Sequence, residues 1–165
     1  MDKLTSQQRS KCMSRIRSAD TKPELIVRRW LWSRGYRYRK NCRRLPGTPD
    51  IVLRRYGAAI FVHGCFWHGH KSHLRLPKTN VEFWEKKIAR NRERDEQNKA
   101  KLREMGWSVL TVWECQLRPP VRHATLMEIE SFLNRSFLAR HGDVKKVRAY
   151  SYGEEVVPMA AEPEE

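Results

Sequence analysis

The chain contains 165 residues, and its 34 Lys and Arg against 19 Asp and Glu give a formal net charge of +15. It has no apolar run of about eighteen residues, and its start, MDKLT, leads into polar sequence, so we expect neither a membrane span nor a secretory signal and place the protein in the cytoplasm. Positive charge of this size attracts polyanions, which favours nucleic acid as the partner over a basic surface that is merely solvated.

The first 20 residues are polar and basic without a clear apolar period, and we expect them to form an arm that contacts the nucleic acid. A helix of about fourteen residues is predicted next. Thr21 suits its N-cap, Pro23 and Glu24 suit its first turn, and Gly35 lies just past its end.

Strands and a second helix are predicted in the middle of the chain. The basic segment YRYRKNCRRLPGTP is a loop or an edge strand, and the runs DIVL and AAIFVH on either side of RRYG predict a hairpin. A long charged helix is expected from Thr79, which begins a second T-x-x-E motif, to Met105, with Gly106 as its stop. WSVLTVWEC, at 107–115, is rich in β-branched and aromatic residues and predicts a central strand.

The C-terminal part begins with a break at Pro119 and Pro120. An amphipathic helix should follow, with apolar positions at Leu126, Ile129, Leu133 and Phe137. The acidic segment 143–165 has too little apolar sequence to pack and is expected to be disordered. The order of elements predicts a mixed α/β domain over 21–142, in which helices flank a central sheet.

The stretch FVHGCFWHGHKSH, residues 61–73, holds four of the six histidines and one of the four cysteines. The cysteines are irregularly spaced and are expected to be free or metal-bound rather than paired. Cys65, His70 and His73 follow the pattern C-x4-H-x2-H, and Cys115 at the end of the last predicted strand can add a fourth ligand. Two thiolates and two imidazoles suit a structural zinc site. Alternatively, the cysteines are small buried residues and the histidines are exposed.

The segment LPGTPDIVL places an acid at the head of the predicted hairpin. Asp50 is one of few acids in a basic surround, as a Mg²⁺ site beside a phosphate requires. The alternative is that Asp50 caps the turn after Gly47 and Pro49. His63 and His68 remain outside the zinc set and are candidates for proton transfer near neutral pH, although a single histidine is more often structural.

Phe66 and Trp67 are adjacent and cannot both point inward from an ordinary strand, so we expect at least one of them to be exposed on a loop. Exposed apolar side chains on a basic protein can insert between base steps and unstack them. Core packing is the alternative, and it is favoured for Trp30, Trp107 and Trp113.

Four motifs in this order and spacing resemble the very short patch repair (Vsr) endonuclease family: PGTPD, IFVHGCFWHGH, EFWEKKIARNRERD and GWSVLTVWEC. The resemblance extends from about Ser10 to about Leu117. It implies a monomeric restriction-endonuclease-like fold with structural zinc. It also implies Mg²⁺-dependent nicking of double-stranded DNA 5′ to the thymine of a T:G mismatch left by deamination of 5-methylcytosine, with mismatch repair proteins and a repair polymerase as partners.

The resemblance also assigns residues. It makes Asp50 the Mg²⁺ ligand together with the backbone carbonyl of Val62, and it makes His63 and His68 catalytic, with Asp95 orienting His68. Further matches are the catalytic acid Glu24, which also fits a capping box, the DNA-intercalating aromatics Phe66, Trp67 and Trp84, and the zinc ligands Cys65, His70 and Cys115.

Two positions depart from the family pattern. Ser72 stands where relatives commonly have a cysteine, and we expect His73 to take its place as a zinc ligand. Val62 stands where a relative carries threonine, which is harmless if only the backbone carbonyl binds Mg²⁺. A zinc-stabilised DNA-binding module without catalysis and a restriction-type nuclease that cuts both strands are the alternative functions.

Overall fold

The computed structural model describes residues 5, 7–8, 11, 19–78 and 80–142. The predicted acidic tail, and the predicted arm apart from a few residues, therefore lie outside the described residues. The elements after the arm are α2 (Lys22–Ser33), β1 (Arg39–Lys40), β2 (Ile51–Leu53), η1 (Arg54–Tyr56), β3 (Ala58–His63), α3 (Val81–Glu104), β4 (Ser108–Trp113), η2 (Glu114–Leu117) and α4 (Pro119–His141). Within this part of the chain, none of the helices has the length and apolar character that crossing a membrane requires.

The strands form one sheet in the order β1-β2-β3-β4. β2 and β3 pair in antiparallel fashion, with Ile51 opposite Ile60, so the predicted hairpin is confirmed. Gly57 closes its turn in the left-handed conformation, with φ of 59°. β3 and β4 are parallel, and α3 lies in the connection between them.

The prediction of a central strand at 107–115 is wrong, because β4 lies at an edge of the sheet. Most residues of β4 are only partly buried, whereas all three residues of β2 are buried. A high content of β-branched and aromatic residues indicates a pleated, half-buried surface rather than a position within the sheet. The strand nevertheless delivers Cys115 just beyond its end, in η2.

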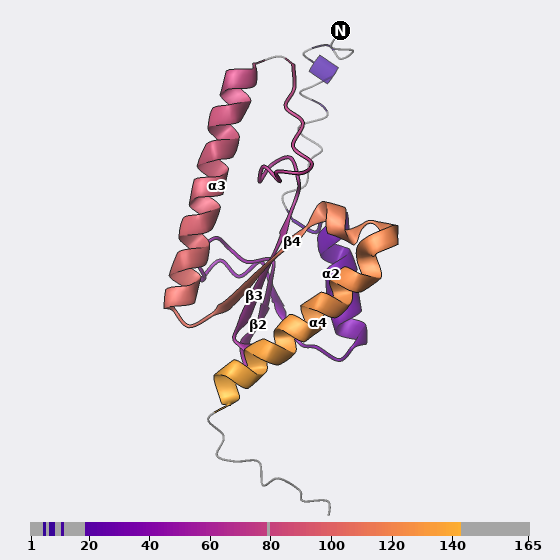
Figure 1. The fold of residues 1–165 in the computed structure, drawn as a ribbon, viewed down its shortest axis with the longest axis vertical. Coiled ribbons are helices and arrows are strands. Elements are labelled where there is room, and N and C mark those ends of the chain that lie inside the picture. Colours follow the sequence, from indigo (N-terminus) through magenta and orange to yellow (C-terminus); the bar gives the residue numbers. More distant parts are fainter. Residues whose placement is uncertain (1–4, 6, 9–10, 12–18, 79, 143–165) are drawn as a thin grey trace, which may run out of the picture.

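Helices cover both faces of the sheet, which confirms the predicted mixed α/β architecture (Figure 1). On one face, Val27 and Leu31 of α2 and Ile129 and Leu133 of α4 pack with Ile60 and other strand residues in the larger core. On the other face, Leu102 of α3 packs with Ala59 and Phe61 of β3 in a smaller one. Because side chains alternate along a strand, His63 follows Ala59 and Phe61 onto the α3 side.

The helix ends agree with the predictions to within a residue or two. α2 has Thr21 as its N-cap, but the Thr21 hydroxyl donates to the Glu24 carboxylate instead of accepting a backbone N–H, so the expected capping box is incomplete. α3 begins at Val81 with Asn80 as its N-cap, later than predicted, and Thr79 lies outside the described residues. Pro119 opens α4 rather than preceding it, because the first turn of a helix tolerates proline.

Candidate active site and metal centre

A cleft of about 870 Å³ lies where the start of α2, the beginning of β2, the end of β3 and the middle of α3 meet. All residues predicted to be catalytic line this one cleft: Glu24, Asp50, His63, His68 and Asp95. Val62, whose backbone carbonyl is the second predicted Mg²⁺ ligand, lines it as well. Two arginines that the sequence did not single out also line it, Arg43 before β2 and Arg94 on α3.

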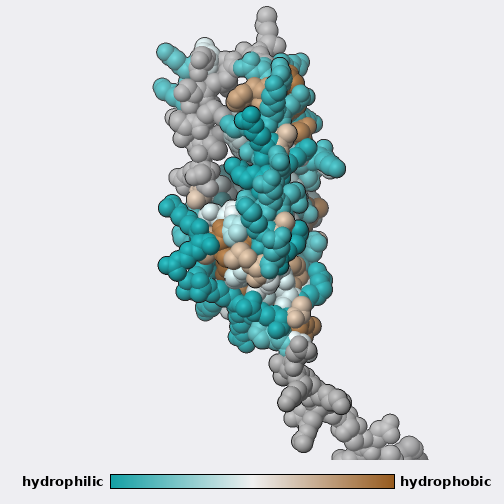
Figure 2. Space-filling model, turned by 90° about the vertical axis from the view of Figure 1, so that its left-hand side faces the viewer, coloured by the Kyte–Doolittle hydropathy of each residue, from teal (hydrophilic) through white to brown (hydrophobic). Residues whose placement is uncertain are grey.

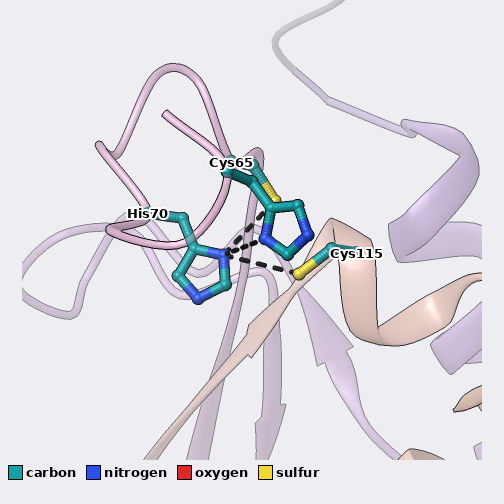
Figure 3. Close-up of side chains that lie close together, drawn as sticks. Cys65, His70 and Cys115 are labelled. Atoms are coloured by element: carbon teal, nitrogen blue, oxygen red, sulfur yellow. Dashed lines mark hydrogen bonds between the residues drawn. The ribbon is translucent and has the colours of Figure 1, made fainter. Parts of the chain in front are cut away.

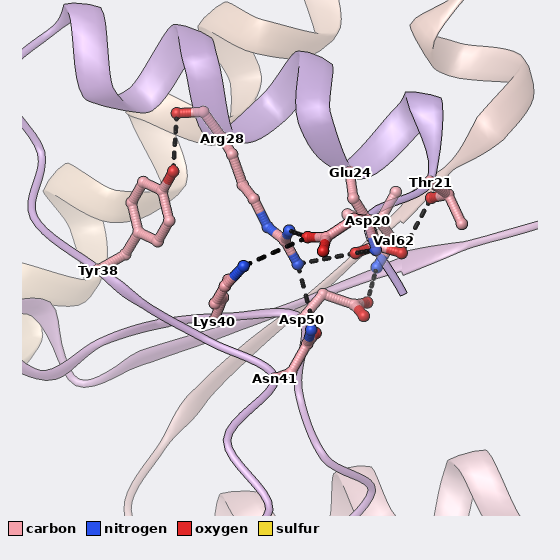
Figure 4. A network of polar contacts seen from close by, with 9 residues as sticks. All are labelled: Asp20, Thr21, Glu24, Arg28, Tyr38, Lys40, Asn41, Asp50 and Val62. Atoms are coloured by element: carbon pink, nitrogen blue, oxygen red, sulfur yellow. Dashed lines mark hydrogen bonds and ion pairs between the residues drawn. The ribbon is translucent and has the colours of Figure 1, made fainter. Parts of the chain in front are cut away.

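Asp50 stands just before β2 and is directed toward β3 (Figure 4). Its Oδ2 accepts the backbone N–H of Val62 at 2.7 Å, while Oδ1 accepts no hydrogen bond from the described part of the chain. Burial raises the pKa of Asp50 to about 6 against the lowering effect of the Val62 hydrogen bond, and the nearby Glu24 carboxylate adds to the rise. The carboxylate therefore does not cap the turn at 47–49, and its free oxygen in the cleft can take a cation.

The two histidines come from different elements and stack on one another. His63 is the last residue of β3 and His68 lies in the following loop, with ring centroids 3.7 Å apart and an interplanar angle of 12°. His68 Nδ1 lies 2.5 Å from Asp95 Oδ2 on α3. Burial, together with the charge of the nearby His68, lowers the pKa of His63 to about 3, so His63 is neutral at neutral pH. Burial raises the pKa of Asp95, but His68 outweighs it and holds the pKa below its ordinary value.

Four Cys and His side chains gather beside the cleft. Their ligand atoms all lie within 4.8 Å of one another, and the set is Cys65, His70, His73 and Cys115. Figure 3 shows three of them, Cys65, His70 and Cys115. His70 Nδ1 lies 3.7 Å from Cys65 Sγ, 3.4 Å from Cys115 Sγ and 3.3 Å from His73 Nδ1. These separations fit the edges of a tetrahedron of sulfur and nitrogen around one zinc ion. Cys42, Cys65 and Cys115 are free thiols, as expected.

The three aromatic residues predicted to contact DNA form one cluster. The ring centroids of Phe66 and Trp67 are 5.2 Å apart, and Trp84 of α3 lies 5.2 Å from Phe66 and 6.0 Å from Trp67. All three are partly exposed. Sequence reasoning missed Phe83, which is 56% exposed and packs on Trp84, although it directly precedes Trp84 in EFWEKK. Figure 2 shows a mostly hydrophilic surface on the α3 side, with hydrophobic residues near the end where α3 begins.

The loop that carries these residues is fastened to α3. Asn91 Nδ2 donates to the Trp67 carbonyl at 2.9 Å, and Arg92 Nη2 donates to the Gly69 carbonyl. Gly69 has φ of 63°, and a Cβ placed there would lie 2.5 Å from Ile88 Cγ2. The close approach of loop and helix therefore requires a glycine between His68 and His70.

Comparison with known proteins identifies the family of the chain. A family model described as DNA mismatch endonuclease Vsr matches residues 1–74. The type II nicking enzyme V.NmeAIP of Neisseria meningitidis is 48% identical over 118 residues, which cover 71% of this chain and 84% of the relative. DNA mismatch endonuclease Vsr of Escherichia coli K12 is 46% identical over 118 residues, which cover 71% of this chain and 74% of that relative. The type II nicking enzyme V.HpaIIP of Haemophilus parainfluenzae is 45% identical over 116 residues, which cover 68% of this chain and 82% of that relative. The chain therefore belongs to the Vsr family of DNA mismatch endonucleases.

Proposed function

We propose that this protein nicks one strand of double-stranded DNA 5′ to the thymine of a T:G mismatch that arises from deamination of 5-methylcytosine, and so starts very short patch repair. One observation carries the proposal: the Asp50 carboxylate, with a free oxygen, and the stacked pair His63 and His68 line the same cleft, beside a partly exposed aromatic cluster. The mixed sheet with helices on both faces is compatible with a restriction-endonuclease-like fold.

The acids of the cleft suit a hard divalent cation. Asp50 would hold Mg²⁺ through its free oxygen, together with the backbone carbonyl of Val62, and Glu24 is a second carboxylate in the same cleft. Bound there, Mg²⁺ supplies Lewis-acid chemistry that neutralises charge on the phosphoryl oxygens.

His68 transfers the proton, and Asp95 and His63 hold its ring in position. Because Nδ1 of His68 is engaged by Asp95, its Nε2 is the nitrogen available to take a proton from the attacking water. Asp95 fixes the ring orientation and stabilises the imidazolium that forms, and His63 keeps the ring stacked in place. His63 itself stays neutral and contributes no charge that would compete for the cation.

The Cys and His set would hold zinc in a structural role. Four protein ligands close the coordination sphere, which is the pattern of structural sites rather than catalytic ones. Zinc held by these residues would fix the loop between β3 and α3 and hence the side chains of Phe66, Trp67 and His68. We infer that Phe66, Trp67 and Trp84 wedge into the DNA beside the mismatch, where unstacking is least costly.

A monomer with a single site cuts one strand, which agrees with nicking rather than double-strand cleavage. After nicking, mismatch repair proteins and a repair polymerase would be the functional partners, and the protein would act in the cytoplasm, at the nucleoid.

The test uses a closed circular plasmid that carries one T:G pair, with a T:A plasmid as the control substrate. We expect wild-type protein to convert only the T:G plasmid to the open circle, with Mg²⁺ and not with EDTA. Asp50→Asn should bind the mismatch normally but nick about 10³-fold more slowly or not at all, whereas Glu104→Gln, at the exposed end of α3, should nick normally. Nicking by Asp50→Asn at the wild-type rate would refute the assignment.

The same experiment separates the two alternatives. Binding of the T:G duplex without metal-dependent nicking would identify a non-catalytic module, and linear product would identify a restriction-type enzyme. The module is disfavoured because it gives Asp50, His63 and His68 no task in a cleft that gathers all three.

A further inference from the structure

Helix α2 carries a buried ion pair at the edge of the cleft. Glu24 and Arg28 lie one turn apart and are only 3% and 4% exposed. Arg28 Nη2 donates to Glu24 Oε2 at 2.7 Å. Burying two charges costs desolvation energy that their attraction seldom exceeds, so a buried ion pair is weak grounds for a role in stability alone. Glu24 also lines the cleft, so the position of the pair indicates a functional role.

The guanidinium of Arg28 reaches three segments of the chain (Figure 4). Besides Glu24, it donates to the Asp20 carboxylate before α2, and to Asn41 Oδ1 after β1 at 3.3 Å. Asn41 in turn donates its backbone N–H to the carbonyl of Asp50 at 3.2 Å. One side chain thus holds two of the acids that line the cleft, Glu24 directly and Asp50 through Asn41.

The Glu24 carboxylate is fixed at both of its oxygens. Oε1 accepts the hydroxyl of Thr21 at 2.9 Å, and Oε2 accepts the backbone N–H of Asp20 at 3.1 Å in addition to Arg28. Asp20 and Asn41, the other two partners of Arg28, both adopt left-handed backbone conformations, with φ of 56° and 47°. Asp and Asn tolerate this conformation better than most residues, and here the bonds from one guanidinium hold both of them.

Resting on the proposed function, we propose that Arg28 is a positioning residue for nicking, which holds Glu24 and the Asn41–Asp50 segment so that the two carboxylates stand at the separation the reaction needs. A planar guanidinium with several directed donors can bridge Asp20, Glu24 and Asn41 at once. The ammonium of lysine is a single point of charge and cannot span the same three partners.

The experiment compares Arg28→Met and Arg28→Lys with Arg29→Met, a matched change at an exposed neighbour on the same helix. Two quantities are measured for each variant: the Kd for a T:G duplex without metal, and the single-turnover nicking rate at saturating Mg²⁺. For both Arg28 variants we expect a Kd within about threefold of wild type and a rate on the order of 10²-fold lower, because a displaced catalytic group costs rate rather than affinity. Arg29→Met should change both quantities by about twofold or less.

A double-mutant cycle with Glu24→Gln tests the route of the effect. If Arg28 acts through Glu24, Arg28→Met should lower the nicking rate in the Glu24→Gln background by only about threefold or less. Independent, multiplicative losses would exclude the route through Glu24 and leave only the route through Asn41 and Asp50, whereas wild-type nicking rates in the Arg28 variants would overturn the proposal. If Arg28→Met does not fold, two other variants decide between these outcomes. One is Arg28→Lys, and the other is the double variant, in which Glu24→Gln removes the buried charge that Arg28→Met would leave unpaired.

The wild-type reaction separates this inference from the proposed function. Failure of wild-type protein to nick the T:G plasmid would remove the proposed function. Metal-dependent nicking by wild type, accompanied by equally fast nicking by Arg28→Lys, would leave that function intact and remove only the positioning role of Arg28.

Discussion

At the scale of single residues, the cleft contains one carboxylate, that of Asp50, that burial makes costly to ionise. The raised pKa of Asp50, about 6, means that the folded protein binds a proton there more tightly than the unfolded chain does. Ionised Asp50 therefore destabilises the metal-free fold, and that penalty grows as the pH rises from the unfolded pKa to the folded pKa and is complete above it. A divalent cation would offset the same penalty.

Asp50→Asn should consequently stabilise the metal-free protein. The amide oxygen of Asn can still accept the Val62 N–H, while the buried charge and its repulsion with Glu24 disappear. We expect a gain on the order of 1–3 kcal/mol at pH 8, falling to about half at pH 5, where wild-type Asp50 is mostly protonated. Thermal melting in EDTA at the two pH values measures it, and a variant that melts below wild type at pH 8 would contradict the argument.

His73 is the residue that we expect to replace a zinc ligand that the family resemblance places at position 72. Its Nδ1 lies 3.3 Å from His70 Nδ1, as a shared zinc ion requires, although its side chain is exposed. Loss of residues that merely support a ligand lowers metal affinity 10–100-fold, so removal of a ligand itself in His73→Ala should weaken zinc binding by about 10²-fold or more. Zinc content after dialysis against a competing chelator reports the loss.

Ser72→Ala is the matched control, because Ser72 occupies the position at which the family resemblance predicts a ligand. It should keep its zinc. If instead Ser72→Ala loses zinc and His73→Ala retains it, the zinc ligand is provided by position 72 and not by His73.

At the scale of elements, the loop between β3 and α3 contributes side chains both to the cleft and to the Cys and His set, and hydrogen bonds hold it against α3. Gly69 separates His68, which faces the cleft, from His70, which faces the metal centre. Gly69→Ala would force a left-handed alanine and push its Cβ against Ile88 and Arg92. We expect a loss of about 2–4 kcal/mol in the free energy of unfolding, with weaker zinc binding and slower nicking.

Gly106→Ala supplies the control for backbone strain. Gly106 also has positive φ, of 80°, but a Cβ there meets nothing within 4 Å. This variant should lose only about 1 kcal/mol and should keep zinc and activity. Equal effects of the two substitutions would mean that strain, and not the contact with α3, explains the phenotype of Gly69→Ala.

The elements also indicate where sequence reasoning succeeds and where it fails. Local signals such as Gly35 after α2 and the RRYG turn predicted the helix and the hairpin correctly, because they act within a few residues. The place of β4 in the sheet depends on which strand it pairs with, and no local signal encodes that. The resemblance named the cleft residues, but the stacking of His63 on His68 and the burial of Arg28 arise from tertiary contacts. A basic residue between Val27 and Arg29 is ordinarily expected at the surface.

At the scale of the whole molecule, the positive charge that attracts DNA is partly offset by the chain itself. The last 13 residues, GEEVVPMAAEPEE, contain five acids and no base, so that deleting them raises the net charge from +15 to +20. Counterion release makes affinity for DNA depend on positive charge and on salt, and charges are screened beyond about 8–10 Å at physiological ionic strength. The acidic segment should therefore weaken binding to undamaged DNA, and most strongly at low salt.

Deletion of residues 153–165 should tighten binding to a T:A duplex several-fold at about 50 mM salt, with the gain shrinking at about 200 mM. Fluorescence anisotropy across this salt range measures the effect. A full-length variant with the five acids changed to glutamine separates charge from length, because it removes the charge and keeps the segment. Tighter binding by both variants would assign the effect to charge, whereas tighter binding by the deletion alone would mean that the bulk of the segment obstructs DNA. The ratio of the affinity for a T:G duplex to that for a T:A duplex gives a second readout. If this ratio falls in both variants, the acids improve discrimination, because they oppose the electrostatic attraction on which non-specific binding depends.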